Sequence, residues 1–228
     1  MRVLLISNSG RPLLEHCRET IADFLRPRRR VGFVSAASLG DERLYCERVR
    51  EALAPLDLEV THVYWKTDPI KALRSVEAIF VGGGNTYALL QRLRASRLLG
   101  AIQDRVHHGV PYMGSSAGAN VAGPTILTTN DWNVVALDRF EALGLVPFNI
   151  NPHYLEADPL LAAGSETRDD RIREYHVVNA NPVLGIEEQT MVRIEDGTAT
   201  VAGRGRVKVF RRGIEPIWHA RGERLPYP

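Results

Sequence analysis

The sequence predicts an α/β protein in which helices cover both faces of a mostly parallel sheet, with antiparallel hairpins near the carboxyl end. Three observations lead to this fold class. Short apolar runs alternate with helical stretches over the first 120 residues, which is typical of parallel sheets. Gly- or Ser-rich turns directly follow two of these runs. The last part of the chain instead contains β-rich runs joined by tight turns.

Individual elements follow from the same pattern. Strands of the parallel sheet are predicted at residues 3–7, 31–35, 58–65, 78–81 and 110–113. Helices are predicted at residues 13–25 and 41–53 and, between Asn85 and Gly109, as two consecutive stretches. Asn85 can cap the first of these stretches through its side-chain oxygen. Because sites in parallel sheets lie beyond the carboxyl ends of the strands, the turns after residues 81 and 113 are the places to search for function.

The carboxyl-terminal runs predict antiparallel hairpins that belong to the same domain. They lie at residues 183–188, 191–194, 198–201 and 207–210, and Glu-Asp-Gly at 195–197 is a typical hairpin turn. No linker, internal repeat or low-complexity segment interrupts the sequence, so residues 1–228 are predicted to form a single domain. The tail after Ile217 carries only weak signals.

Composition and charge exclude several classes of function. The net charge of +2 gives no reason to expect nucleic-acid binding, and the basic run at residues 26–30 is explained by a solvated entry to the next strand. Cys17 and Cys46 are expected to be reduced thiols. The first residues turn polar too early for a signal peptide, and no apolar run reaches about 18 residues. A cytoplasmic protein that does not enter a membrane is therefore expected.

The most informative motif is Gly-Ser-Ser-Ala-Gly at residues 114–118. It matches the G-x-S-x-G pattern of a nucleophile elbow, with an apolar run before it and a segment after it that can begin a helix. Such a turn is tight enough to require small neighbours, and it lifts the Ser116 hydroxyl clear of the backbone. The alternative is an ordinary Gly/Ser turn. Neither cysteine lies in the motif, which disfavours an amidotransferase.

A serine nucleophile requires a base and a third group that orients the base. Among the seven histidines, His153 is the best candidate for the base, because it follows an apolar stretch in a Pro/Asn-rich segment that is predicted to be a loop. Asp131 and Glu188 compete for the third role, and each is alternatively explained as a structural turn residue or a surface acid. Spacing cannot choose between them, because the members of a triad meet only in three dimensions.

A glycine run, Gly82-Gly83-Gly84-Asn85-Thr86, follows the strand predicted at 78–81. It lacks the Gly-Lys-Ser/Thr of a P-loop and the third glycine of a dinucleotide fingerprint, so no phosphate site is expected. Close backbone approach is a better role: an N–H of Gly84 or Gly83 would complete an oxyanion hole beside the N–H of Ala117. The alternative is a plain strand-to-helix turn. No HExxH or CxxC pattern occurs, and no metal or other cofactor is predicted.

Taken together, these segments resemble the aspartyl dipeptidase (peptidase E) family of serine peptidases. The matching runs lie at residues 80–86, 114–120, 124–126, 128–131, 150–153, 166–168 and 171–174, and the resemblance extends from residue 3 to about residue 188. It implies a fold similar to class I glutamine amidotransferases, with serine in place of their cysteine nucleophile. It also implies an exopeptidase that needs no cofactor and releases an N-terminal aspartate, mainly from Asp-X dipeptides.

The resemblance further implies roles for individual catalytic residues. Ser116 matches the nucleophile and His153 matches the general base. Glu188 matches the triad acid by its place after Gly-Ile. The adjacent Glu187 is an alternative match, one position earlier in the sequence. Asp131 matches a second acid of the active site, so both acids stay under consideration.

Two further residues are expected to bind substrate. Arg168 matches the arginine that holds the β-carboxylate of the substrate, and Asn85 in the glycine run is the second candidate. A guanidinium offers a planar pair of donors to a carboxylate, which an Asn or Gln substrate could not replace. The alternative for Arg168 is an exposed helix salt bridge with Asp169 or Asp170. The sequence departs from the family at Ser115, where an aromatic residue is often found, and this adds a second hydroxyl beside the nucleophile.

Two rival functions stay open. One is a cyanophycinase-like peptidase that acts on β-linked aspartyl-arginine, which a preference for β-Asp-Arg over Asp-Leu would reveal. The other is a non-catalytic homologue that binds an acidic small molecule, against which the retained Ser116, His153 and Glu188 argue. A small peptide is thus the expected partner, and the sequence is compatible with a monomer or a homodimer.

Overall fold

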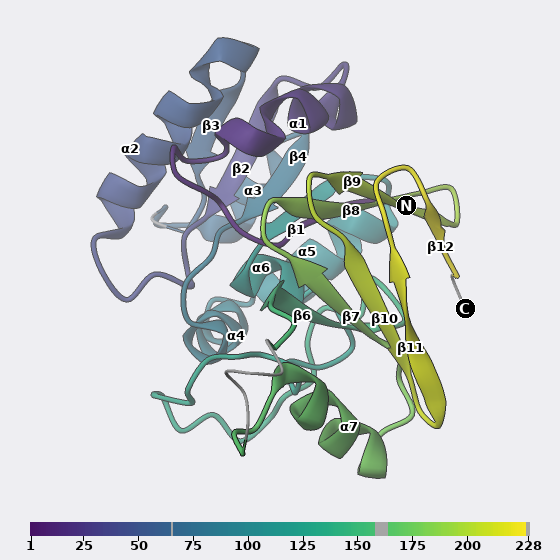
Figure 1. Cartoon of the computed structure of the whole chain (residues 1–228). Coiled ribbons are helices and arrows are strands. Elements are labelled where there is room, and N and C mark those ends of the chain that lie inside the picture. Colours follow the sequence, from purple (N-terminus) through teal and green to yellow (C-terminus); the bar gives the residue numbers. More distant parts are fainter. Residues whose placement is uncertain (65, 158–163, 227–228) are drawn as a thin grey trace.

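The parallel part of the larger sheet is built from the apolar strands of the amino-terminal half of the chain (Figure 1). In the computed structural model, which describes residues 1–64, 66–157 and 164–226, this sheet has the order β12-β9-β8-β1-β5-β4-β2-β3. Strands β1 to β5 pair in parallel and span Arg2–Ile6, Arg30–Val34, Glu59–His62, Ala78–Val81 and Tyr112–Ser115. The predicted parallel sheet is confirmed. The strand predicted at 58–65 ends at His62, and residue 65 lies outside the described residues.

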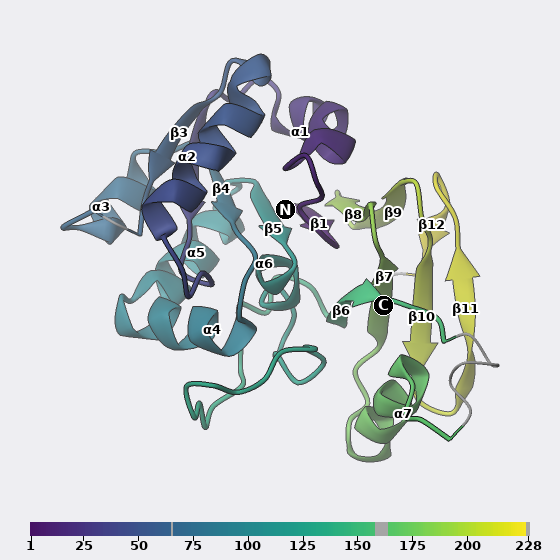
Figure 2. The same ribbon diagram turned by 60° about the vertical axis from the view of Figure 1, so that its left-hand side comes forward.

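Helices cover both faces of this sheet, as predicted (Figure 2). One face carries α1 (Arg18–Leu25) and α2 (Glu42–Leu53); the other carries α3 (Pro69–Arg74), α4 (Thr86–Ala95), α5 (Leu98–His107) and α6 (Ala117–Asn120). Short 3₁₀ helices span Glu15–Cys17 and Ala54–Leu56, so the α-helix predicted at 13–25 begins only at Arg18. Along β1, Leu4 and Ile6 face one core whereas Val3 and Leu5 face the other. A strand buried on both faces must be apolar throughout, which explains the continuous run that predicted it.

The carboxyl-terminal strands are antiparallel as predicted, but they divide between two sheets. Strands β8 (Thr190–Glu195), β9 (Thr198–Gly203) and β12 (Arg224–Leu225) extend the larger sheet next to β1. Strands β7 (Val183–Glu187), β10 (Val207–Arg211) and β11 (Ile214–His219) form a smaller sheet with β6 (Asn149–Tyr154). Helix α7 (Arg168–Val178) packs on this smaller sheet through Ile172. The sequence does not predict this division, because the pairing of these strands depends on contacts between distant segments.

The prediction that His153 lies in a loop is wrong, because this residue belongs to β6. The Pro and Asn residues around it are typical of loops. In the structure, however, β6 pairs in parallel with β7 on both sides of an irregularity between Asn151 and Tyr154. Pro152 falls at this irregularity, where the regular ladder is interrupted, so its missing N–H costs no regular ladder bond. The strand therefore tolerates a sequence that resembles a loop.

The register of the parallel strands brings four polar or glycine positions to one edge of the larger sheet. Ile6 lies opposite Ser115, Val81 opposite Gly114, and Val34 opposite Val81. The residues that follow these strands are Ser7, Gly82, Ser116 and Ser35, and they lie along the same carboxyl edge. This edge is where open α/β sheets place their sites.

A pH-dependent contribution to stability is expected from His62, which ends β3 and is only 7% exposed. Burial, together with the nearby positive charges of Arg50, Lys66 and Arg43, lowers the pKa of His62 to about 4. Below the ordinary value of 6.5, the unfolded chain binds a proton at this residue that the folded protein does not bind. Stability therefore falls as the pH drops from about 6.5 towards 4, by at most about 3 kcal/mol from this group.

Urea unfolding at pH 7 and pH 4.5 measures this contribution. The variant His62→Gln keeps a polar group beside the Ser35 hydroxyl, which lies 2.7 Å from Nε2 of His62, and cannot titrate. Between the two pH values we expect the variant to lose about 2 kcal/mol less stability than the wild type. Equal losses in the two proteins would contradict the assignment.

Candidate active site

Ser116 lies in a strained turn between β5 and α6, which is the predicted strand–turn–helix context of an elbow. Its backbone has φ 53° and ψ −111°, a region that residues with a side chain rarely adopt. The flanking glycines are required by close contacts: a Cβ on Gly114 would lie 2.2 Å from the Gly118 carbonyl oxygen, and one on Gly118 would lie 2.1 Å from that of Val81. Local sterics thus explain the motif, and the turn presents the Ser116 side chain at the carboxyl edge of the sheet.

Ser116, His153 and Glu188 form a hydrogen-bonded series. Nε2 of His153 lies 2.7 Å from Oγ of Ser116, and Nδ1 of the same ring lies 2.6 Å from Oε1 of Glu188. His153 and Glu188 come from the smaller sheet, where Glu188 directly follows β7, whereas Ser116 comes from the larger sheet. The His153 and Glu188 side chains are 40% and 53% exposed, so the series lies open to solvent.

Asp131 lies elsewhere, at the amino-terminal end of α4. Its Oδ2 accepts hydrogen bonds from the backbone N–H of Thr86 at 2.8 Å and from the Thr86 hydroxyl at 2.6 Å. Asn85 acts beside it: Oδ1 accepts from the N–H of Ala88, and Nδ2 donates to the Trp132 carbonyl oxygen. Both side chains therefore join the segment at 131–132 to the start of α4, and the structure does not bring Asp131 to His153.

The glycine run lies against Ser116. A Cβ on Gly83 would lie 3.0 Å from the Cβ of Ser116. The N–H of Gly83 donates to Oη of Tyr45 at 3.0 Å, whereas no hydrogen bond from the N–H of Gly84 is found in the described part of the chain. Gly84 has φ 139°, and a Cβ there would lie 2.2 Å from the Ala37 carbonyl oxygen, so only glycine fits.

These residues surround a pocket of about 380 Å³. Its lining includes Gly83, Gly84, Ser116, His153 and Glu188, together with Tyr45 and Arg11. Sequence reasoning missed the last two. Tyr45 was recognisable only as part of the apolar face of a helix, and Arg11 lies in a loop segment without a motif. Burial raises the pKa of the Tyr45 phenol above its ordinary value.

Arg168 lines a second pocket, of about 390 Å³, together with Asn130, Asn151 and Arg171. Among the described residues its guanidinium has no hydrogen-bond or ion-pair partner. Burial and the nearby charge of Arg171 lower the pKa of Arg168. This pocket adjoins the segment of His153, because Nδ2 of Asn130 donates to the carbonyl oxygen of Pro152, the residue before His153. The structure thus places Arg168 in a pocket next to that of Ser116 and not in the same one.

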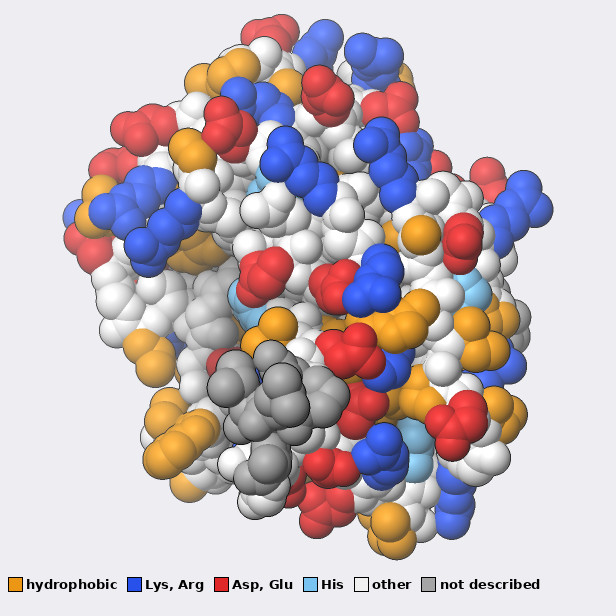
Figure 3. Space-filling model, viewed as in Figure 1, with side chains coloured by type: hydrophobic (Ala, Val, Ile, Leu, Met, Phe, Trp, Pro, Cys, Tyr) orange, Lys and Arg blue, Asp and Glu red, His pale blue; other side chains and the backbone are white. Residues whose placement is uncertain are grey.

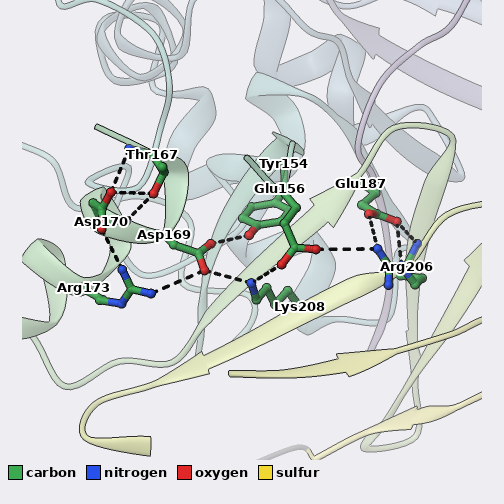
Figure 4. A network of polar contacts seen from close by, with 9 residues as sticks. All are labelled: Tyr154, Glu156, Thr167, Asp169, Asp170, Arg173, Glu187, Arg206 and Lys208. Atoms are coloured by element: carbon green, nitrogen blue, oxygen red, sulfur yellow. Dashed lines mark hydrogen bonds and ion pairs between the residues drawn. The ribbon is translucent and has the colours of Figure 1, made fainter. Parts of the chain in front are cut away.

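The alternative explanation of Arg168 as a helix salt bridge is wrong, because both neighbouring acids have other partners (Figure 4). Asp169 pairs with Nζ of Lys208 at 2.8 Å and accepts a hydrogen bond from the Tyr154 hydroxyl. Asp170 caps α7 with Thr167 and pairs with Arg173 at 2.7 Å. The acids therefore hold α7 in place and do not pair with the Arg168 guanidinium.

Lys208 is the centre of the network that fixes α7 to the smaller sheet. Its side chain is 8% exposed and binds Oε1 of Glu156 as well as Asp169, both at 2.8 Å. Burial alone would lower the pKa of Lys208, but these hydrogen bonds raise it above its ordinary value. Arg206 continues the network from Glu156 to Glu187, the residue before Glu188 (Figure 4). The Arg206–Glu187 contact also shows that Glu187 and Glu188 have different partners, and that the acid at His153 is Glu188.

Charges of both signs are interspersed over the face of the molecule shown in Figure 3, which has no continuous basic surface. In the described part of the chain, no three His, Cys, Asp or Glu side chains are grouped so that they could hold a metal ion. None of the helices described combines the length and the apolar character that crossing a membrane requires.

An elbow serine, an imidazole and a carboxylate in hydrogen-bonded series at the carboxyl edge of a parallel sheet have the geometry of a serine hydrolase. Residues 3–202 match peptidase family S51, and the chain belongs to this family. The resemblance found in the sequence is thereby confirmed.

Relatives of similar sequence cover almost the whole chain. Peptidase E of Streptomyces coelicolor is 45% identical over 219 residues, which are 95% of this chain and 90% of that protein. A Drosophila melanogaster protein named "Probable alpha-aspartyl dipeptidase" is 44% identical over 215 residues, covering 92% of this chain and 89% of its own. The crystal structure of a peptidase from an acI-B1 Actinobacterium has a TM-score of 0.77 at 16% identity, covering 98% of this chain and 96% of that chain. This last similarity shows that the fold is shared.

Proposed function

We propose that the protein is a serine peptidase that hydrolyses dipeptides with an N-terminal aspartate. The observation that carries the proposal is the series from Ser116 to His153 to Glu188, in which both hydrogen bonds already have the lengths that nucleophile activation requires. The names of two relatives, peptidase E and alpha-aspartyl dipeptidase, support the substrate class. Arg168 in the neighbouring pocket, which has no partner among the residues that the structure describes, supplies a cation for the aspartate side chain.

In the proposed reaction, Oγ of Ser116 attacks the carbonyl carbon of the N-terminal aspartate while its proton passes to Nε2 of His153. Glu188 accepts the hydrogen bond from Nδ1–H, holds the ring in place and stabilises the imidazolium. His153 then gives the proton to the leaving amine as the peptide C–N bond breaks. The remaining aspartyl ester on Ser116 is hydrolysed by a water molecule from which His153 takes a proton, and this restores the free serine.

The N–H groups of Ala117 and Gly84 are the proposed donors of the oxyanion hole. The residue after an elbow nucleophile supplies one such donor in comparable folds, and here this residue is Ala117. Gly83 is less suitable than Gly84, because the N–H of Gly83 already donates to Tyr45. The φ of 139° and the close approach to Ala37 restrict this position to glycine, and Gly84 lines the same pocket as Ser116.

Arg168 is the proposed binding site for the β-carboxylate of the substrate aspartate. Arg168 is half-buried, and its guanidinium has no anionic partner among the described residues, so a substrate carboxylate would supply one through two charge-assisted hydrogen bonds. Asparagine has the same shape but no charge, so it would leave the cation unpaired. The proposed selectivity for aspartate over asparagine thus depends on this side chain.

Replacing Arg168 by methionine is expected to lower kcat/KM for Asp-Leu roughly 10- to 100-fold, the usual range for the loss of a charge-assisted pair. The low rate with Asn-Leu should change by less than about threefold, because that substrate never used the charge. Arg173→Met is the matched control, since Arg173 lies on the same helix but already pairs with Asp170. Steady-state kinetics with both substrates measure these changes. Equal losses of kcat/KM for Asp-Leu in the two variants would contradict a specific role of Arg168 and assign the effect to α7 as a whole.

Hydrolysis of Asp-Leu, Asn-Leu, Glu-Leu, β-Asp-Arg and Asp-Leu-Gly by the purified protein tests the proposed function. Cleavage of Asp-Leu well above the other four peptides is expected. A preference for β-Asp-Arg would instead establish the cyanophycinase-like alternative. Binding of Asp-Leu without cleavage of any peptide would support a non-catalytic homologue and refute the proposal.

A further inference from the structure

Three consecutive polar residues, Ser7, Asn8 and Ser9, follow β1 at the point where the two sheets meet. Figure 2 shows β6 and β7 beside the carboxyl end of β1. The proposed triad spans this junction, because Ser116 follows a strand of the larger sheet, whereas His153 lies in β6 and Glu188 directly follows β7 of the smaller one. The geometry of the triad therefore depends on how the two sheets are fixed to each other here.

Ser7, directly after β1, connects the larger sheet to β6 and β7, two neighbouring strands of the smaller sheet. Its hydroxyl is fully buried, accepts a hydrogen bond from the backbone N–H of His153 at 2.9 Å and donates to the Ile186 carbonyl oxygen at 2.8 Å. His153 has φ 54°, a conformation that costs free energy for a residue with a side chain and that surrounding contacts must maintain. The Ser7 hydroxyl supplies such a contact directly at the backbone of the base.

Asn8 and Ser9 act in the same way on the other two members of the triad. Oδ1 of Asn8 accepts a hydrogen bond at 2.8 Å from the N–H of Gln189, the residue after Glu188. Oγ of Ser9 lies 2.8 Å from Oγ of Ser115, the residue before Ser116. Each of these side chains therefore contacts a residue adjacent in sequence to the nucleophile or the acid.

We propose that Ser7, Asn8 and Ser9 are positioning residues that set the three members of the triad relative to one another. This inference rests on the proposed function, since it assumes that Ser116, His153 and Glu188 act together. Hydrogen bonds of neutral groups are individually weak, but a displacement of the reacting atoms by about 1 Å can cost on the order of 100-fold in rate. Loss of these contacts should thus lower kcat far more than it affects substrate binding.

Ser7→Ala is the main test, with Ser35→Ala as its matched control. Ser35 is an equally buried serine after β2 of the same sheet, and its hydroxyl contacts Glu42 and His62 instead of the triad. We expect Ser7→Ala to lower kcat for Asp-Leu roughly 10- to 100-fold with KM changed less than about threefold. Ser35→Ala should destabilise the protein to urea by a similar amount and keep kcat within about twofold of the wild type.

Two variants of Asn8 test the positioning role independently, so the proposal can still be tested if Ser7→Ala does not fold. Asn8→Ala removes the acceptor for Gln189 and should lower kcat about 10-fold, whereas Asn8→Asp retains an acceptor oxygen and should recover most of that loss. The rate at which a fluorophosphonate labels Ser116 should follow kcat in all variants, because this reaction depends on the triad and not on aspartate recognition.

Wild-type kcat and wild-type labelling in both Ser7→Ala and Asn8→Ala would overturn the inference. An equal fall of kcat in Ser35→Ala would also overturn it, since the effect would then follow general destabilisation. Failure of the wild type to cleave Asp-Leu would be a failure of the proposed function alone, and the labelling rates would still report on positioning.

Discussion

Replacing Ser116 by alanine is expected to lower kcat/KM for Asp-Leu by about 10⁴-fold or more. The substitution removes the atom that would form the proposed acyl-enzyme, while the imidazole and the proposed oxyanion donors stay in place. Deleting a triad nucleophile has effects of this size because base, nucleophile and acid work as a unit. Steady-state hydrolysis of Asp-Leu, followed by release of leucine, measures the change.

Ser115→Ala is the informative control, because Ser115 carries a second hydroxyl next to the nucleophile. This hydroxyl is buried and contacts Ser9, so we expect a loss of no more than about 10-fold. A loss in Ser115→Ala as large as in Ser116→Ala would place the nucleophile in doubt. Hydrolysis that persists in Ser116→Ala would remove the elbow serine from the mechanism.

The second large effect is expected for the acid of the triad. Glu188→Gln should lower kcat roughly 10²- to 10⁴-fold, because the amide cannot stabilise the imidazolium and can impose the wrong tautomer on His153. The side chain is 53% exposed, so solvent can replace part of its contribution and the lower half of this range is expected.

Asp131→Asn is the comparison that tests the choice between the two acids. The variant weakens the contacts that hold the segment at 131–132 to Thr86, and a loss of stability of about 1 kcal/mol is expected. We expect kcat to fall by less than about 10-fold, since Asp131 does not contact the base. A larger loss of kcat in Asp131→Asn than in Glu188→Gln would show that the triad acid is misassigned.

The nucleophile elbow could be predicted from sequence because its physical constraints lie within five residues. The close contact of Gly114 with Gly118 and the strained backbone of Ser116 are local, so the motif itself carries them. The parallel sheet was predictable for a similar reason, since strands buried on both faces leave continuous apolar runs. Only the resemblance to a family added the substrate class, because no local constraint encodes it.

The choice between Asp131 and Glu188 required the structure. Both acids follow plausible patterns, but only the packing of the smaller sheet against the larger one brings Glu188 to Nδ1 of His153. The placement of His153 in a loop was wrong because Pro152 and two asparagines occupy an irregular strand. Contacts between distant segments decide both questions, and no short stretch of sequence contains them.

Arg168 illustrates the same limit. Its two acidic neighbours in the sequence favour a local salt bridge, yet Lys208, about 40 residues away, and Arg173 engage them instead. Contacts between α7 and β10, and not the neighbouring sequence, therefore decide that Arg168 does not pair with Asp169 or Asp170. The proposed role of Arg168 in substrate selectivity depends on this arrangement and on the pocket that Arg168 lines.

The central claim is that Ser116 is the nucleophile of a site that binds an N-terminal aspartate. The most direct test is to inactivate the wild type with a fluorophosphonate in the presence of Asp-Leu or Asn-Leu and to locate the label by tandem mass spectrometry. We predict one label per chain, on Ser116, formed in proportion to the loss of activity and slowed by Asp-Leu much more than by Asn-Leu. Loss of activity with the label on another residue, or a labelled Ser116 in a protein that still cleaves Asp-Leu, would contradict the account.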